Sequence, residues 1–151
     1  MLLFFYLSSM KIFFPDKLLF KKSKKVKNYK KINNILRIMK KEIKNYKEYV
    51  AISSVQIGYL KRIFIVKNIL NKKYYTFINP KILWKSKIKK YSYEGCISIP
   101  NFYNKILRNR EILLETYCEK KIYHKFFFKN FFSFCVQHEI DHLNGKLINM
   151  V

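Results

Sequence analysis

Apolar residues recur at intervals of three and four between Tyr29 and Tyr46, which is the spacing of one face of an α-helix. The outer face of this segment is rich in lysine, so the pattern predicts an amphipathic helix in the N-terminal third of the chain. A second helical pattern begins at about Phe131 and runs toward the C-terminus. The apolar positions of the first helix are Ile32, Ile35, Leu36, Met39, Ile43 and Tyr46.

Four segments between the two helices are rich in β-branched and aromatic residues, which favours β-strands. They cover residues 62–66, 74–78, 111–117 and 122–128, and the second is expected to end at Asn79-Pro80. Their connections are short and polar, so antiparallel pairing is the natural arrangement. No internal repeat and no linker rich in Pro, Gly or Ser divides the chain.

The length of 151 residues, half of them hydrophobic, allows one domain with a substantial core. We assign this domain to residues 10–151 and treat residues 1–9 as a non-native or flexible extension, with Met10 as an alternative start. The apolar run Leu2 to Leu7 is shorter than the roughly 18 residues that cross a membrane. No basic residue precedes it, as a secretory signal would require. The sequence therefore predicts no membrane partner.

Three cysteines, an odd number without C-x-x-C spacing, do not predict a disulfide framework. A reducing compartment, the cytoplasm, is the simpler interpretation.

The formal net charge of +23 raises the question of a nucleic-acid partner. However, the chain is crowded with Lys, Ile, Asn, Phe and Tyr and has one alanine, Ala51, which indicates nucleotide bias rather than selection for charge. A dedicated DNA-binding protein would also favour arginine for bidentate contacts. We therefore expect no DNA partner, and only weak attraction to RNA-rich surroundings.

Two of the three histidines lie four residues apart in the segment QHEIDHLNG, residues 137–145. On a helix, His138 and His142 would share one face and could bind a single metal ion at about 2.0 Å, with Glu139 beside a bound water. A buried structural pair of histidines is the alternative.

One metalloprotease pattern, H-E-x-x-H-x-x-G-x-x-H, supplies a third histidine downstream, but this chain has Ile148 at that position. No residue after His142 is acidic, so the third metal ligand must lie upstream. Cys135 shares the helical face, but seven helical residues span about 10 Å, which is too far for one ion. Core or surface roles suit Cys118 and His124, which adjoin strand-like segments. Cys96, directly after Glu94-Gly95, stands apart from these candidates.

Three segments of the chain resemble the motifs of the peptide deformylases, enzymes that remove the formyl group from the N-terminal methionine of new proteins. The segments are SSVQIG at 53–58, YEGCIS at 93–98 and QHEIDH at 137–142. The resemblance runs in the family's order from about Phe14 to Gly145. All three glycines of the chain fall within or beside these motifs.

The resemblance implies a metal site, a general base, two oxyanion donors and a pocket for the methionine side chain. It implies Fe(II) as the working ion, although the same ligand types would accept Zn, Ni or Co. It also suggests that Arg108 pairs with Glu94 to brace the cysteine loop. The implied residues are Cys96, His138 and His142 for the metal, Glu139 as base, Gln56 through its amide and Ile97 through its backbone N–H for the oxyanion, and Val50, Ala51, Phe131, Phe134 and Cys135 for the pocket.

The chain departs from the family's first motif, G-x-G-L-A-A-x-Q. Tyr49 and Ala51 replace the two glycines, and Ser53 and Ser54 replace the two alanines. Glycine lets two backbones approach closely, so Tyr49 bears on how the substrate backbone lies along this segment.

We therefore expect an α+β fold with antiparallel β-strands packed around the helix that carries the H-E-x-x-H motif, plus the N-terminal amphipathic helix. The expected function is deformylation of N-formylmethionyl nascent peptides by a cytoplasmic monomer with transient ribosome association. The alternatives are another metal-dependent peptidase or amidase, or a basic RNA-associated protein whose site has decayed.

Overall fold

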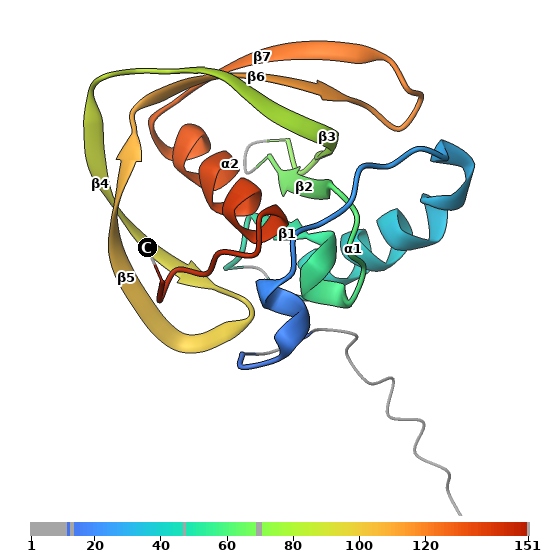
Figure 1. Ribbon diagram of the computed structural model, residues 1–151, viewed down its shortest axis with the longest axis horizontal. Coiled ribbons are helices and arrows are strands. Elements are labelled where there is room, and N and C mark those ends of the chain that lie inside the picture. The colour runs from blue at the N-terminus through green and yellow to red at the C-terminus, as the bar shows by residue number, and fades with distance from the viewer. Residues whose placement is uncertain (1–11, 13, 47, 69–70, 151) are drawn as a thin grey trace, which may run out of the picture.

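The computed structural model describes residues 12, 14–46, 48–68 and 71–150, so the expected extension over residues 1–9 lies outside it. Two sheets and two α-helices form most of the fold (Figure 1). The second helix, α2 (Asn130–Leu143), lies in the middle of the view, with the long strands curving around it. The prediction of a mixed α+β fold with antiparallel strands is confirmed.

The larger sheet has five strands in the order β1, β2, β3, β6, β7, and the smaller one pairs β4 with β5. All these pairs are antiparallel. No helix among the described residues is both long and apolar enough to cross a membrane. The strands are β1 (Ala51–Ser53), β2 (Ile63–Lys67), β3 (Tyr74–Lys85), β4 (Lys89–Cys96), β5 (Ile99–Asn109), β6 (Glu111–Tyr117) and β7 (Tyr123–Lys129).

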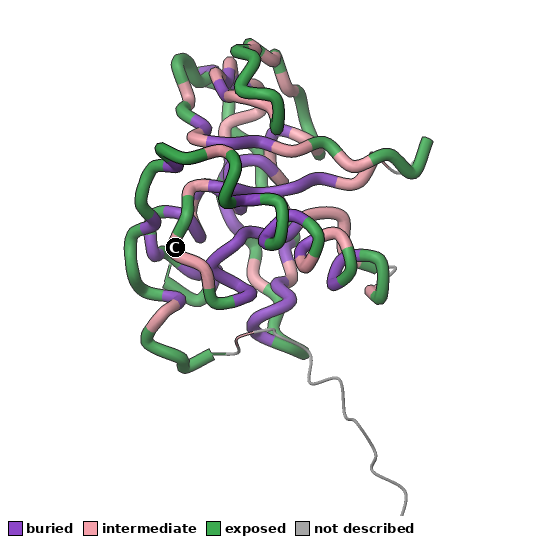
Figure 2. The backbone as a smooth tube through the Cα atoms, turned by 90° about the vertical axis from the view of Figure 1, so that its right-hand side faces the viewer, coloured by how far each residue is buried: buried purple, intermediate pink, exposed green. Residues whose placement is uncertain are grey.

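Two of the three clusters of buried side chains join the larger sheet to the helices, and Figure 2 shows such buried positions along the inner strands, with exposed ones on the outer turns. One group joins the apolar face of α1 (Asn33–Asn45) to β1 and β2 through residues such as Met39, Ile43 and Ile52. The other joins the five-stranded sheet to α2 through residues such as Phe64 and Leu143. Burying each such side chain contributes about 1.5–3 kcal/mol.

The first helix is shorter than its apolar repeat predicted. Asn28 accepts a hydrogen bond on its side chain from the backbone N–H of Lys30 at 3.0 Å, and this closes a 3₁₀ turn over Tyr29–Lys31. The α-helix then starts at Asn33 and ends before Tyr46, which has an extended backbone.

The prediction that the second strand ends at Asn79-Pro80 was wrong, because β3 continues to Lys85. The pairing of β3 with β6 shifts between Ile78 and Lys81, and Asn79 has a φ of 52°. A β-bulge of this kind accommodates a proline, which has no N–H to donate to the ladder.

Strands β1, β4 and β5 were not predicted. In β4 and β5 the buried positions carry the charged Glu94 and Arg108 as well as Cys96, Ile99 and Ile106, whereas Tyr91 and Tyr93 are 63% and 77% exposed. The alternation of buried apolar and exposed polar residues is therefore broken, because the inner face of this sheet holds charged groups of the candidate site and its outer face holds tyrosines. A pattern search for buried apolar residues therefore misses both strands.

Candidate active site

Helix α2 and strand β4 bring Cys96, His138 and His142 together. The Sγ atom of Cys96 lies 3.2 Å from Nε2 of His142, and this nitrogen lies 3.1 Å from Nε2 of His138. One potential ligand atom from each residue lies within 4.8 Å of the others, and all three residues are buried. Atoms so placed can share one ion at bond lengths of about 2.0–2.3 Å.

The chemistry of these three residues fits a metal cation. The Nδ1 atom of His138 lies 3.0 Å from Oε2 of Glu94. A carboxylate accepts, so Nδ1 carries a proton, and the Nε2 atom faces the Cys96 sulfur and His142. Once a metal displaces the protons on the facing atoms, three donor atoms would face one point that a shared cation can occupy. Sulfur and imidazole donors suit Fe, Zn, Ni or Co.

The charges around the cluster favour the thiolate that a metal requires. Burial would raise the pKa of the Cys96 thiol, but His142 and His138 hold it well below its ordinary value. Burial would likewise lower the pKa of His138, yet its hydrogen bonds with Cys96 and Glu94 raise it to about 10. The same negative groups that attract a proton here would attract a cation.

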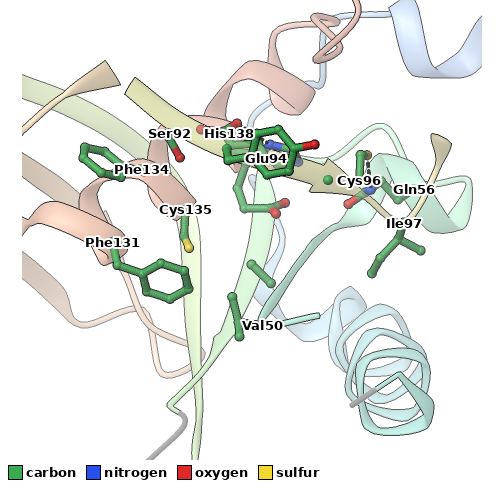
Figure 3. Close-up of a pocket in the computed structure, with 14 residues that line it drawn as sticks. Val50, Gln56, Ser92, Glu94, Cys96, Ile97, Phe131, Phe134, Cys135 and His138 are labelled. Carbon is green, nitrogen blue, oxygen red and sulfur yellow. Dashed lines mark hydrogen bonds and ion pairs between the residues drawn. The ribbon is translucent and has the colours of Figure 1, made fainter. Parts of the chain in front are cut away.

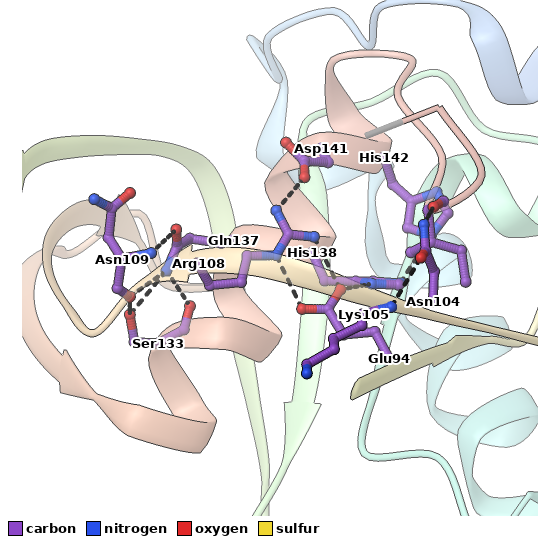
Figure 4. Close-up of polar contacts among 11 residues, drawn as sticks. Glu94, Asn104, Lys105, Arg108, Asn109, Ser133, Gln137, His138, Asp141 and His142 are labelled. Atoms are coloured by element: carbon purple, nitrogen blue, oxygen red, sulfur yellow. Dashed lines mark hydrogen bonds and ion pairs between the residues drawn. The ribbon is translucent and has the colours of Figure 1, made fainter. Parts of the chain in front are cut away.

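Behind His138 lies a buried charged network (Figure 4). Arg108 donates from Nε and Nη2 to the two carboxylate oxygens of Glu94, both at 2.9 Å, and from Nη1 to Asp141. Burial alone would raise the pKa of Glu94, but the hydrogen bonds from Arg108 and His138 lower it to about 2. The predicted pairing of Arg108 with Glu94 is confirmed, and it ties β4 and β5 to α2.

Sequence reasoning assigned no role to Asp141 or Gln137, although both lie within the motif that it singled out. Asp141 completes the Arg108 network. Gln137 donates to the carbonyl oxygen of Asn109 at 2.8 Å and accepts from the N–H of Asn109 at 3.1 Å, which anchors the end of β5 to α2. Their partners lie about thirty residues away in sequence, so only the fold reveals these contacts.

A pocket of about 160 Å³ opens beside the metal-ligand cluster (Figure 3). In this view Phe131, Phe134 and Cys135 lie on one side, and Cys96 lies on the other. Burial raises the pKa of Cys135 to about 12, with Glu139 and Glu94 adding to the rise, so this cysteine remains a thiol. The five residues that the sequence suggested for a pocket, Val50, Ala51, Phe131, Phe134 and Cys135, all line this one. The other lining residues are Gln56, Ser92, Tyr93, Glu94, Gly95, Cys96, Ile97, His138 and Glu139.

Gln56 is held in a defined orientation by Ser53. Its Oε1 accepts from the backbone N–H of Ser53 at 2.9 Å, which turns Nε2 toward Cys96 Sγ at 3.5 Å and Ser98 Oγ at 3.3 Å. The side-chain amide therefore presents its donor end to the cluster.

Glu139 lines the pocket and is 3% exposed. Burial raises the pKa of its carboxyl, while His138, His142 and a hydrogen bond from Ser53 oppose that rise. A carboxyl in such an environment is suited to accept and return a proton.

Tyr49, which replaces a glycine of the family motif, does not line the pocket. Its ring packs edge-on against Tyr46 with the ring centroids 6.3 Å apart, next to the buried cluster of α1. At Gly95 a Cβ atom would lie 2.8 Å from the ring of Tyr103, so a larger residue there would displace that exposed ring.

Comparisons with known proteins agree with this geometry. A family model described as polypeptide deformylase matches residues 12–150. The chain is 39% identical over 124 residues to peptide deformylase of Karelsulcia muelleri (strain GWSS), a match that covers 80% of this chain and 65% of that protein. It is 34% identical over 133 residues to peptide deformylase 2 of Clostridium acetobutylicum, covering 87% of each.

Two solved structures show the same fold. The crystal structure of a peptide deformylase from Legionella pneumophila matches with a TM-score of 0.87 and 26% identity, over 93% of this chain and 84% of the other. That of peptide deformylase from Thermotoga maritima matches with a TM-score of 0.86 and 27% identity, over 92% and 93%. The chain spans just under two thirds of the length of the Karelsulcia relative. The family model, in contrast, matches nearly all of this chain, residues 12–150. The chain therefore belongs to the polypeptide deformylase family.

Proposed function

We propose that this protein is a peptide deformylase, a hydrolase that removes the formyl group from the N-terminal methionine of newly made proteins and releases formate. The observation that carries the proposal is the convergence of Cys96, His138 and His142 beside a pocket that also contains the buried Glu139. Membership of the deformylase family supports the reaction class.

Cys96, His138 and His142 would hold the metal, and we propose Fe(II), with Zn, Ni or Co as ions that the same donors accept. When bound, the ion would supply Lewis-acid polarisation to a water molecule and to the formyl oxygen. The chain contributes the fixed geometry: Glu94 orients the His138 ring, and Arg108 holds Glu94 in turn.

Glu139 is the proposed general base. Its carboxylate takes a proton from the water that attacks the formyl carbon, and returns it to the nitrogen of the departing amine as the C–N bond breaks. The products are formate and a free methionyl N-terminus. The Nε2 amide of Gln56 and the backbone N–H of Ile97 would stabilise the negative charge that develops on the formyl oxygen.

The methionine side chain would enter the apolar part of the pocket, between Phe131, Phe134 and Cys135 on α2 and the segment Val50-Ala51. An unbranched thioether suits a narrow pocket with aromatic walls. Ala51 is a small replacement for the family's glycine, so the peptide backbone can still run along this segment.

The remaining assignments follow from this role. We propose a monomer that acts in the cytoplasm on N-formylmethionyl nascent peptides, with transient ribosome association and no DNA or membrane partner. We also propose that residues 10–151 form one metallohydrolase domain, in which α2 is the central helix that presents the H-E-x-x-H motif and α1 is the amphipathic helix of the N-terminal part. A chain that starts at Met10 should then unfold as cooperatively as the full chain.

The test is formate release from a formyl-methionyl tripeptide by protein purified anaerobically with iron. The unmodified protein should turn over, and Glu139→Gln should keep its metal while turnover falls by at least about a hundredfold. Cleavage of ordinary peptide bonds without formate release would favour a metal-dependent peptidase. Absence of both a stoichiometric ion and turnover would favour a decayed, RNA-associated protein.

A further inference from the structure

The hydroxyl group of Ser53 contacts the proposed general base directly. Ser53 is the last residue of β1 and is fully buried. Its Oγ donates to Oε2 of Glu139 at 2.5 Å, and the backbone carbonyl oxygen of Glu139 lies 3.2 Å from the same hydroxyl. The two residues are 86 positions apart in sequence, so the contact exists only because β1 packs against α2.

A glutamate that accepts a proton must be aimed, since its side chain has three rotatable torsions. A hydrogen bond from an anchored donor to one carboxylate oxygen fixes the terminal torsion and leaves the other oxygen for the reacting water. Ser53 is well anchored, because β1 pairs with β2 at this residue, opposite Phe64. Its hydroxyl therefore restrains the carboxylate of Glu139 from a rigid position.

Ser53 also contacts Gln56, through two groups. The Gln56 side chain accepts from the backbone N–H of Ser53, a bond that any residue except proline could make. In the same capping box the Ser53 hydroxyl accepts from the backbone N–H of Gln56. A substitution by alanine should therefore remove the contact with Glu139 and this cap, and keep the bond that orients the Gln56 side chain. The effect of losing the cap does not depend on Glu139, so a double-mutant cycle with Glu139 separates the two effects.

Alanine is compatible with the backbone at this position, because Ser53 has an ordinary extended conformation with φ −94° and ψ 150°.

We propose that Ser53 is a positioning residue, whose hydroxyl holds the Glu139 carboxylate in the orientation that accepts the proton of the attacking water. The inference rests on the proposed deformylase function and extends it to a residue that the family pattern does not assign.

The experiment compares kcat and KM for a formyl-methionyl tripeptide in Ser53→Ala and in the unmodified, iron-loaded protein. A misaligned base slows the proton transfer and leaves substrate binding intact, so kcat should fall by about tenfold while KM and metal content stay unchanged. A crystal structure of Ser53→Ala should show the Glu139 carboxylate in more than one orientation, with Gln56 unmoved. Ser54→Ala is the matched control, because this neighbouring buried hydroxyl contacts the carbonyl oxygens of Tyr59 and Lys61 instead.

A double-mutant cycle separates positioning from a general structural effect. If Ser53 acts through Glu139, then adding Ser53→Ala to Glu139→Gln should cause no further fall in kcat. An unchanged kcat in Ser53→Ala, or an equal fall with and without Glu139→Gln, would overturn the inference alone. A lack of turnover in the unmodified protein would instead overturn the proposed function and the inference with it.

Discussion

The two walls of the pocket fix their polar groups by different means. On one wall, formed by α2 and β4 with β5 behind them, the buried charges of Glu94 and Arg108 and the partly exposed Asp141 bind one another and orient a metal ligand. On the other wall, formed by β1 and the 3₁₀ turn Ser54–Ile57, neutral groups such as the Ser53 hydroxyl and the Gln56 amide form hydrogen bonds without an ion pair.

This difference indicates how strongly substitutions in each wall should affect the stability of the protein. A buried charge that loses its partner costs several kcal/mol of folding free energy. Removing one member of the charged wall should therefore destabilise the whole network. A neutral hydroxyl or amide can be removed singly at about 1 kcal/mol. We therefore expect changes in the charged wall to reduce metal binding or stability, and changes in the neutral wall to reduce turnover alone.

The largest effect should come from Cys96→Ala, which removes one of the three proposed metal ligands. Two imidazoles on one helix leave the site incomplete, so the purified protein should lose its stoichiometric metal and all measurable turnover. Cys118→Ala is the control, since Cys118 lies outside the ligand cluster, and it should retain both. Metal analysis decides the matter: equal metal content in the Cys96→Ala and unmodified proteins would contradict the assignment.

Arg108→Met should cost about 3–5 kcal/mol of unfolding free energy, because it removes the guanidinium that pairs with the buried carboxylate of Glu94 and with Asp141. Chemical denaturation measures this change. Lys40→Met provides the contrast, because Lys40 pairs with Glu119 at 2.8 Å where both side chains are more than one third exposed. Exposed pairs contribute up to about 1 kcal/mol. Similar losses of unfolding free energy in the two variants would show that the buried network stabilises the fold no more than an exposed ion pair does.

Gln56→Ala should act on turnover rather than on the metal. It removes one proposed oxyanion donor, for which mutagenesis typically gives a fall in kcat of about 10²–10³-fold. Metal content should stay at the unmodified level, since Gln56 is 3.5 Å from the Cys96 sulfur through its Nε2 donor and is not among the candidate ligands. Loss of the ion from this variant would mean that the neutral wall also supports the metal site, and the contrast between the walls would fail.

The two walls also differ in how far the sequence predicted them. His138 and His142 follow from helical spacing, which is a local rule, whereas Cys96 and the pocket residues of α2 came from the resemblance to the deformylase motifs. The roles of Ser53 and Asp141 depend on partners brought together by the fold, so no local pattern could reveal them. Strands β4 and β5 escaped prediction because their buried face mixes the charged Glu94 and Arg108 with apolar residues, while tyrosines lie on the exposed face.

Ser54→Ala should have the smallest effect and should separate the two adjacent serines of the neutral wall. The Ser54 hydroxyl is 2.6 Å from the carbonyl oxygen of Lys61 and 2.9 Å from that of Tyr59. Both carbonyls keep another donor, the N–H groups of Ile63 and Lys61 respectively, so neither is left without a hydrogen bond. The variant should therefore lose only about 0.5–1.5 kcal/mol of unfolding free energy, measured by denaturation, with kcat unchanged. A fall in kcat as large as that of Ser53→Ala would show that any small change in this segment disturbs the pocket, and that the Ser53 hydroxyl has no specific part in it.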